Sequence, residues 1–153
     1  MARIEDIPEP TRTVVLGLPI AASAAPAFLG GPPLAARRVA IVSSAALYRR
    51  GETPFLPGSG EYRALPADTP AGDILMSHVS INFDRSGWQR DLNTVFPIDR
   101  LRELAAEGFV GAAAATHYSV MGSTDPQAMT ATAGAMAAQM RAEGVGAAVL
   151  SPV

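Results

Sequence analysis

Residues 97–108 read PIDRLRELAAEG, and the apolar run FVGAAAA follows at 109–115. In the first stretch, apolar residues recur at the spacing of one helical face, and a glycine stands where a left-handed helix cap is favoured: Ile98, Leu101, Leu104, Ala105 and Gly108. The second stretch is too short and too uniformly apolar for a surface helix, and it suits a strand that is covered on both faces. The pattern predicts a helix followed by a buried strand.

The same order is repeated further along the chain. Residues 123–126 read STDP, which supplies helix N-cap side chains followed by a proline at the first helical position. A helix is expected from there to Glu143, and residues 145–150 form another short apolar run. Helices that alternate with apolar strands predict an α/β fold, a three-layer sandwich with a mostly parallel sheet of Rossmann-like or flavodoxin-like type. With no helix to cover its last strand, the fold is expected to be incomplete at its C-terminus.

Upstream of this region the strand signals are shorter. Residues 38–44 form a continuous, β-branched apolar run that predicts a strand covered on both faces. Residues 62–66 predict a short strand or edge segment that stops at its proline, and residues 73–79 predict a further strand. Residues 1–36 contain six prolines and are expected to be irregular. We therefore expect one α/β domain over residues 37–153.

Composition excludes several kinds of chemistry. The 153 residues carry a formal charge of −2, all twelve basic residues are arginine, and there is no cysteine. Without lysine there is no Schiff-base chemistry and no standard phosphate-binding loop, and without cysteine these residues hold no disulfide, thiolate nucleophile or cysteine metal site. The charge balance gives no reason to bind nucleic acid or an anionic membrane.

The longest apolar stretch, residues 14–28, is broken by glycine and proline and is too short to span a bilayer. Its small residues resemble a signal-peptide cleavage region, but acidic residues precede it where export requires basic ones. We expect a cytoplasmic protein.

Both histidines of the chain follow predicted strands. His78 lies near the carboxyl end of the strand predicted over 73–79, and His117 follows the run at 109–115. Sites of parallel sheets lie at the carboxyl ends of strands, so the two imidazoles are candidates for a proton-transfer pair. The alternative is a pair of polar residues that are satisfied at the sheet edge. A metal site is not favoured, because two histidines at this separation show no ligand spacing.

Two other segments are candidates for function. The turn from Tyr118 to Gly122 leads from a strand into a helix, whose first amides could bind a substrate carboxylate. The turn lacks the glycine pattern of dinucleotide-binding folds. The polar segment 82–97 is expected to form either a network that holds an active-site loop or a surface loop with its own salt bridges.

Four segments occur in an order that resembles a known family: YRALP at 62–66, LMSHV at 75–79, NTVFPIDRL at 93–101 and HYSVMG at 117–122. They resemble the selenoprotein B family of glycine, sarcosine, betaine and D-proline reductases, most closely the small D-proline reductase type. The resemblance covers residues 38–153 and is strongest over 75–122. It places His78 and His117 among catalytic positions, and Ser77, Tyr118 and Gly122 among substrate-binding positions.

The resemblance implies the reductive cleavage of a carbon–nitrogen bond in a small amine or amino acid. In the family, a selenocysteine or cysteine reacts with a substrate that is activated on a partner subunit carrying a pyruvoyl group. The reactive residue belongs directly after a strand of the kind VGAAVLSPV, and here nothing follows Val153. We therefore expect a sequence that stops before a selenocysteine or cysteine codon, and a chain that has no cofactor of its own.

Two alternatives remain open. The chain is either such a reductase subunit, inactive without its nucleophile, or a short cysteine-free relative that acts as a binding or scaffolding subunit. An acid–base enzyme that uses His78 and His117 alone is a third possibility. A homo-oligomer is compatible with each of these readings.

Overall fold

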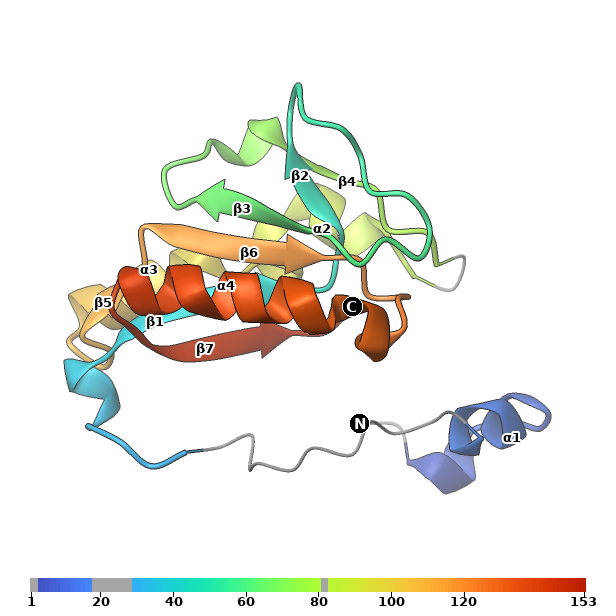
Figure 1. The fold of residues 1–153 in the computed structure, drawn as a ribbon. Coiled ribbons are helices and arrows are strands. Elements are labelled where there is room, and N and C mark those ends of the chain that lie inside the picture. The colour runs from blue at the N-terminus through green and yellow to red at the C-terminus, as the bar shows by residue number, and fades with distance from the viewer. Residues whose placement is uncertain (1–2, 18–28, 81–82) are drawn as a thin grey trace.

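The fold is known from a computed structural model, which describes residues 3–17, 29–80 and 83–153. A central sheet lies between helix α4 (Thr130–Ala142) on one face and helix α3 (Ile98–Ala106) on the other (Figure 1). The predicted three-layer α/β sandwich is confirmed. Residues 18–28, on which the expectation about export partly rests, and Asn82 lie outside the described residues.

Strand β1 (Arg38–Ser43) is the centre of the sheet, and it occupies the run that the sequence predicts as a buried strand. On one side it pairs in parallel with β7 (Val145–Ser151) along its whole length. On the other side it pairs in parallel first with β5 (Ala112–Ala113) and then with β6 (Thr116–Val120). The sheet is therefore mostly parallel, as expected.

The edge next to β6 is formed by β3 (Tyr62–Pro66), which runs antiparallel to it. Residues 62–66 are predicted as a short strand or edge segment, and β3 is a short strand at the edge. A second, two-stranded antiparallel sheet consists of β2 (Leu47–Arg49) and β4 (Ile74–Met76). The strand predicted over 73–79 thus forms, but in this small sheet rather than beside the parallel strands.

The strand predicted over 109–115 has different limits in the structure. The amides of Phe109 and Val110 both donate to the Leu104 carbonyl and close the end of α3, so they are not available to the sheet. Gly108 has φ +76°, the left-handed conformation predicted for the helix cap. Pairing with β1 begins only at β5 and continues in β6, so His117 lies inside a strand and not beyond its end.

The main core lies between the sheet and α3. The helix contributes Ile98 and Leu101, the sheet contributes Val39, Ile41 and Leu65, and the segment before the helix contributes Val95 and Phe96. That segment holds α2 (Ser86–Arg90) and the short 3₁₀ helix η4 (Leu92–Thr94), neither of which the sequence indicates. The predicted helix from residue 126 forms as the 3₁₀ helix η5 (Pro126–Met129) followed by α4.

Strand β7 forms where predicted, but it is not buried. Val149 is 43% exposed and Leu150 is 73% exposed. Among the described residues only β1 pairs with β7, so the strand is an edge and its outer side meets no other strand. An apolar run without alternation does not by itself distinguish a central strand from such an edge.

The N-terminal segment holds one short helix, α1 (Thr11–Leu16), and a 3₁₀ turn, η1 (Ile4–Asp6). None of the side chains in α1 is buried, and the helix lies apart from the sheet in Figure 1. Two further 3₁₀ turns, η2 (Leu34–Ala36) and η3 (Ala71–Asp73), precede β1 and β4. None of the described helices is long and apolar enough to cross a membrane.

Replacing Ser119 with alanine tests how the sheets are joined. Its buried hydroxyl donates to the Ser43 carbonyl at 3.0 Å and accepts the Leu47 amide at 2.8 Å, so it connects β6, β1 and β2. Ser119→Ala leaves a buried amide without a partner, and we expect the free energy of unfolding in urea to fall by about 2 to 3 kcal/mol. The exposed Ser123→Ala serves as the control, and an equal effect of the two variants would contradict this role.

Candidate functional site

Serine hydroxyls gather where the parallel strands end. Ser43 ends β1 and Ser151 ends β7, and both donate to the carbonyl of Val95, at 2.7 and 3.0 Å. Ser44 accepts the amide of Val153 at 2.8 Å. We call this region the carboxyl edge. These three hydroxyls bond to backbone groups at or beside the strand ends, so they are already occupied within the chain.

His117 lies in the interior and has no exposed surface. Its Nδ1 accepts the amide of Ile41 at 3.0 Å, at the point where the neighbouring strand is interrupted between β5 and β6. The ring packs edge-on against Phe96, with centroids 5.5 Å apart. Burial lowers the pKa of His117 to about 4; Glu143 opposes this shift and Arg102 adds to it. The imidazole is neutral at pH 7, with its proton on Nε2 because Nδ1 accepts.

His78 follows β4 and is 5% exposed. Its Nδ1 accepts the amide of Ser80 at 3.2 Å, and its ring lies 5.5 Å from that of Phe83. Burial lowers the pKa of His78, and the nearby Arg85 lowers it further. Arg85 also donates to the His78 carbonyl at 2.7 Å and so fixes the backbone at this position.

The two imidazoles share one property. In each ring Nδ1 is bonded, whereas the buried Nε2 has no partner within the described residues. No interaction within those residues joins one ring to the other. His117 belongs to the main sheet and His78 follows the small one, and the pair that the sequence suggests stays a prediction.

The three predicted substrate-binding residues lie in different surroundings. The hydroxyl of Ser77 accepts the amide of Phe55 at 3.0 Å and donates to the Ala46 carbonyl at 3.2 Å. Tyr118 is 1% exposed on the other face of β6 from His117, and burial raises its pKa, with Glu143 and Tyr62 acting in the same direction. Gly122 is exposed at the carboxyl edge.

Gly122 packs closely against Ser44, because a Cβ at this glycine would lie 2.9 Å from the Ser44 carbonyl oxygen. Its amide donates to that same oxygen at 3.0 Å. Of the predicted site residues, Gly122 is the one that is exposed, and it lies at the carboxyl edge. The sequence analysis did not single out Ser43, Ser44, Ser119 or Ser151, although paired serines directly after a β-branched run are a usable signal for a strand end.

The polar segment before α3 forms a network of its own. Asp91 accepts the amide and side chain of Asn93 at 2.9 and 2.8 Å, and Asn93 in turn bonds to the side chain and amide of Asp99 at 3.0 and 2.9 Å. These bonds lower the pKa of both carboxyl groups. The network fixes the start of α3 and, through it, the Val95 carbonyl at the carboxyl edge.

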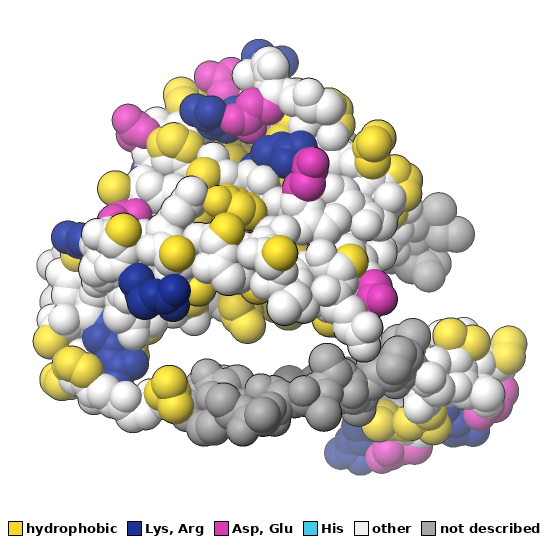
Figure 2. All heavy atoms as spheres, in the orientation of Figure 1, with side chains coloured by type: hydrophobic (Ala, Val, Ile, Leu, Met, Phe, Trp, Pro, Cys, Tyr) yellow, Lys and Arg dark blue, Asp and Glu magenta, His cyan; other side chains and the backbone are white. Residues whose placement is uncertain are grey.

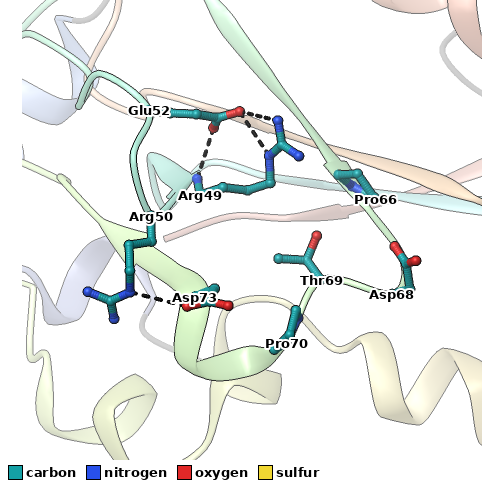
Figure 3. A pocket seen from close by; sticks show the side chains of 8 residues that line it. All are labelled: Arg49, Arg50, Glu52, Pro66, Asp68, Thr69, Pro70 and Asp73. Carbon is teal, nitrogen blue, oxygen red and sulfur yellow. Dashed lines mark hydrogen bonds and ion pairs between the residues drawn. The ribbon is translucent and has the colours of Figure 1, made fainter.

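A cavity of about 570 Å³ lies elsewhere, between the end of β2 and the loop after β3 (Figure 3). Arg49 pairs with Glu52 at 2.6 Å and Arg50 with Asp73 at 3.1 Å across its wall. Pro66 lines the cavity and pairs with Thr116, the first residue of β6, so the cavity is at the opposite end of the sheet from the carboxyl edge. None of the predicted site residues lines it. Among described residues, no group of three or more acidic or histidine side chains is placed to hold a metal ion.

The neutral state of His117 predicts a pH dependence of stability. In the unfolded chain a histidine has a pKa near 6.5, against about 4 in the fold, so the unfolded chain binds more protons between these values. The free energy of unfolding should fall by about 3 kcal/mol as the pH drops from 7 to 4.

His117→Asn is the matched variant, because the asparagine oxygen can accept the Ile41 amide in place of Nδ1 and does not titrate. The free energy of unfolding in urea is measured at pH 7 and at pH 4. It should fall more between these pH values in the unchanged protein than in His117→Asn. Carboxyl groups contribute equally to both proteins and cancel. Equal losses in the two proteins would show that His117 does not titrate as described.

Comparison of the sequence with known proteins identifies a family. Residues 73–153 match the sequence model described as glycine/sarcosine/betaine reductase selenoprotein B. The chain is also similar to the D-proline reductase subunit gamma of Acetoanaerobium sticklandii, with 34% identity over 116 residues, which are 74% of this chain and 47% of that protein. The chain thus spans about half the length of this relative. No solved structure matches the chain significantly. Since the matched region covers more than half of the chain, the protein belongs to the glycine/sarcosine/betaine reductase selenoprotein B family.

Proposed function

We propose that the chain is part of a reductase subunit that takes part in cleaving a carbon–nitrogen bond of a small amine or amino acid. The observation that carries this proposal is the family match over residues 73–153, which includes all five predicted site residues. The relative in Acetoanaerobium sticklandii is named as a subunit of D-proline reductase. The proposal extends that kind of reaction to this chain and leaves its substrate within the class of amines and amino acids.

The chain contains no cysteine, so the selenolate or thiolate of such a reaction is supplied from outside these 153 residues. We place it beside the carboxyl edge, where the Ser44 hydroxyl accepts the Val153 amide and Gly122 packs closely against Ser44. A partner subunit with a pyruvoyl group would activate the substrate, and no described residue of this chain is required to hold that group. The cytoplasm is the proposed location.

The histidines have a specific part in this proposal. A buried N–H without a partner is costly, by about 1 to 3 kcal/mol. Among the described residues three buried side-chain nitrogens have no partner: Nε1 of Trp88 and Nε2 of both histidines, which are the only imidazoles of the chain. With its pKa near 4, His117 is almost never an imidazolium at pH 7. We infer that the two Nε2 groups act as neutral hydrogen-bond donors to developing negative charge, in the way that a neutral imidazole acts as an electrophile in other enzymes.

The burial of the candidate site residues and their hydrogen bonds within the chain favour a second function. Ser77 and the serines of the carboxyl edge are bonded within the chain, and His117 has no exposed surface. These observations fit a scaffolding subunit, in which the same residues hold the fold and another chain performs the chemistry. The two functions differ in whether Nε2 of either histidine is needed for turnover.

Asparagine substitutions separate the two functions. His117→Asn and His78→Asn keep an acceptor at the position of Nδ1 and delete Nε2. In the assembled reductase with its partner subunit, we expect each variant to lower kcat by about 10² or more while the thermal unfolding temperature stays close to that of the unchanged protein.

His117→Ala provides the comparison, because it also removes the acceptor for the buried Ile41 amide and should lower stability. Unchanged kcat in both asparagine variants would refute the donor role and favour the scaffolding function.

A further inference from the structure

A second cavity, of about 380 Å³, lies at the amino ends of the parallel strands. It is lined by the junction of η2 and β1, the turn before β5 and the turn before β7: Ala35, Ala36, Arg37, Arg38, Gly111, Ala112 and Gly144. We call it the arginine pocket. Arg38 is the first residue of β1 and Ser43 the last, so the pocket is roughly 16 Å from the carboxyl edge.

The charged residues that line this pocket are all positive. Arg37 and Arg38 are its only charged lining residues. Seven arginines of the described chain form ion pairs with a carboxylate, and neither of these two is among them. In a protein with a net charge of −2, two adjacent guanidinium groups without a carboxylate partner make a local site for an anion.

The guanidinium groups still have donors to offer. The Nε of Arg37 donates to the Pro32 carbonyl, and one terminal nitrogen of Arg38 donates to the Glu143 carbonyl. A guanidinium has five N–H donors, so most of the donors of both groups make no bond within the described residues. Glu143, whose carbonyl accepts from Arg38, accepts the Ala115 amide with its carboxylate.

Glycines surround the two side chains. A Cβ at Gly31 would lie 2.8 Å from a terminal nitrogen of Arg37, and one at Gly146 would lie 3.4 Å from Cγ of the same side chain. A Cβ at Gly144 would lie 3.6 Å from a terminal nitrogen of Arg38. The Arg37 side chain is thus held in a channel that larger residues would close, which places its guanidinium before a ligand arrives.

The backbone does not contribute donors here. The amides of Gly111 and Gly144 donate to the carbonyls of Leu34 and Arg141, and the amide of Ala112 donates to that of Arg37. Binding therefore depends on the guanidinium groups. Figure 2 shows basic side chains, all of which are arginine in this chain, on the side of the molecule where α4 ends and β7 begins.

We propose that the arginine pocket binds the phosphate group of a small phosphorylated ligand. Two planar guanidinium groups present more donors than the two oxygens of a carboxylate accept, whereas a phosphate has at least three oxygens to receive them. The site is distinct from the carboxyl edge and does not depend on the proposed reductase function.

Inorganic phosphate is the probe for the first experiment. We expect isothermal titration calorimetry of the 153-residue chain at pH 7.5 to show binding of phosphate, and no comparable binding of acetate at the same ionic strength. Arg37→Gln and Arg38→Gln should each weaken binding about tenfold or more, as the loss of charge-assisted bonds requires. Arg90→Gln, which changes the net charge equally, should leave it unchanged.

A second pair of variants separates geometry from charge. Gly31→Val introduces a side chain against the Arg37 guanidinium, whereas Gly30→Val meets open space. Both keep every arginine, and we expect about tenfold weaker phosphate binding only in Gly31→Val. If phosphate binds no better than acetate, or if Arg37→Gln and Arg38→Gln bind it as the unchanged protein does, the proposal is wrong. Weakening by Arg90→Gln to the same extent would show attraction to net charge alone and would also refute it.

Discussion

The amide of Ile41 imposes the constraint on which the rest of the sheet depends. It lies in the middle of the buried central strand, where an unpaired donor is costly, and the strand beside it is interrupted at that point. The Nδ1 atom of His117 fills the gap at 3.0 Å. With this bond in place, β6 continues past the interruption in register, pairing Val42 with Tyr118 and Ser43 with Ser119. The same ring closes the core against Phe96, so one side chain satisfies the backbone and also packs the interior.

The two ends of the sheet differ in what they leave available. At the carboxyl edge the hydroxyls of Ser43, Ser119 and Ser151 are engaged with backbone carbonyls and amides, so this end is built mainly to hold the strand ends in place. At the amino end, the bonds that the Arg37 and Arg38 guanidinium groups make within the described residues are to carbonyls, and most of their donors are not used there. A reaction centre at the first end and an anion site at the second can therefore coexist without sharing a residue.

Periodicity and cap residues in the sequence were enough to predict α3, with its glycine cap, and β1 as a buried strand within an α/β sandwich. The surroundings of the histidines were not predictable in this way. A run such as FVGAAAA does not show that its first residues close a helix end, so the strand was expected about four residues too early and His117 beyond its end. The exposure of β7 also escaped prediction, because apolar composition is the same for an edge strand as for a central one. Motif resemblance, in contrast, indicated the family correctly from a few short segments.

The two nitrogens of each imidazole have different roles, and this difference connects the fold to the proposed chemistry. In both rings the fold uses Nδ1 as an acceptor, which fixes the proton on Nε2, and it leaves Nε2 buried without a partner in the described residues. A purely structural role needs only the acceptor atom, and a residue without a second buried polar atom would fill that role at a lower cost in free energy. The retained donor, together with a lowered pKa that keeps the ring neutral, is what a site needs in order to stabilise negative charge without transferring a proton.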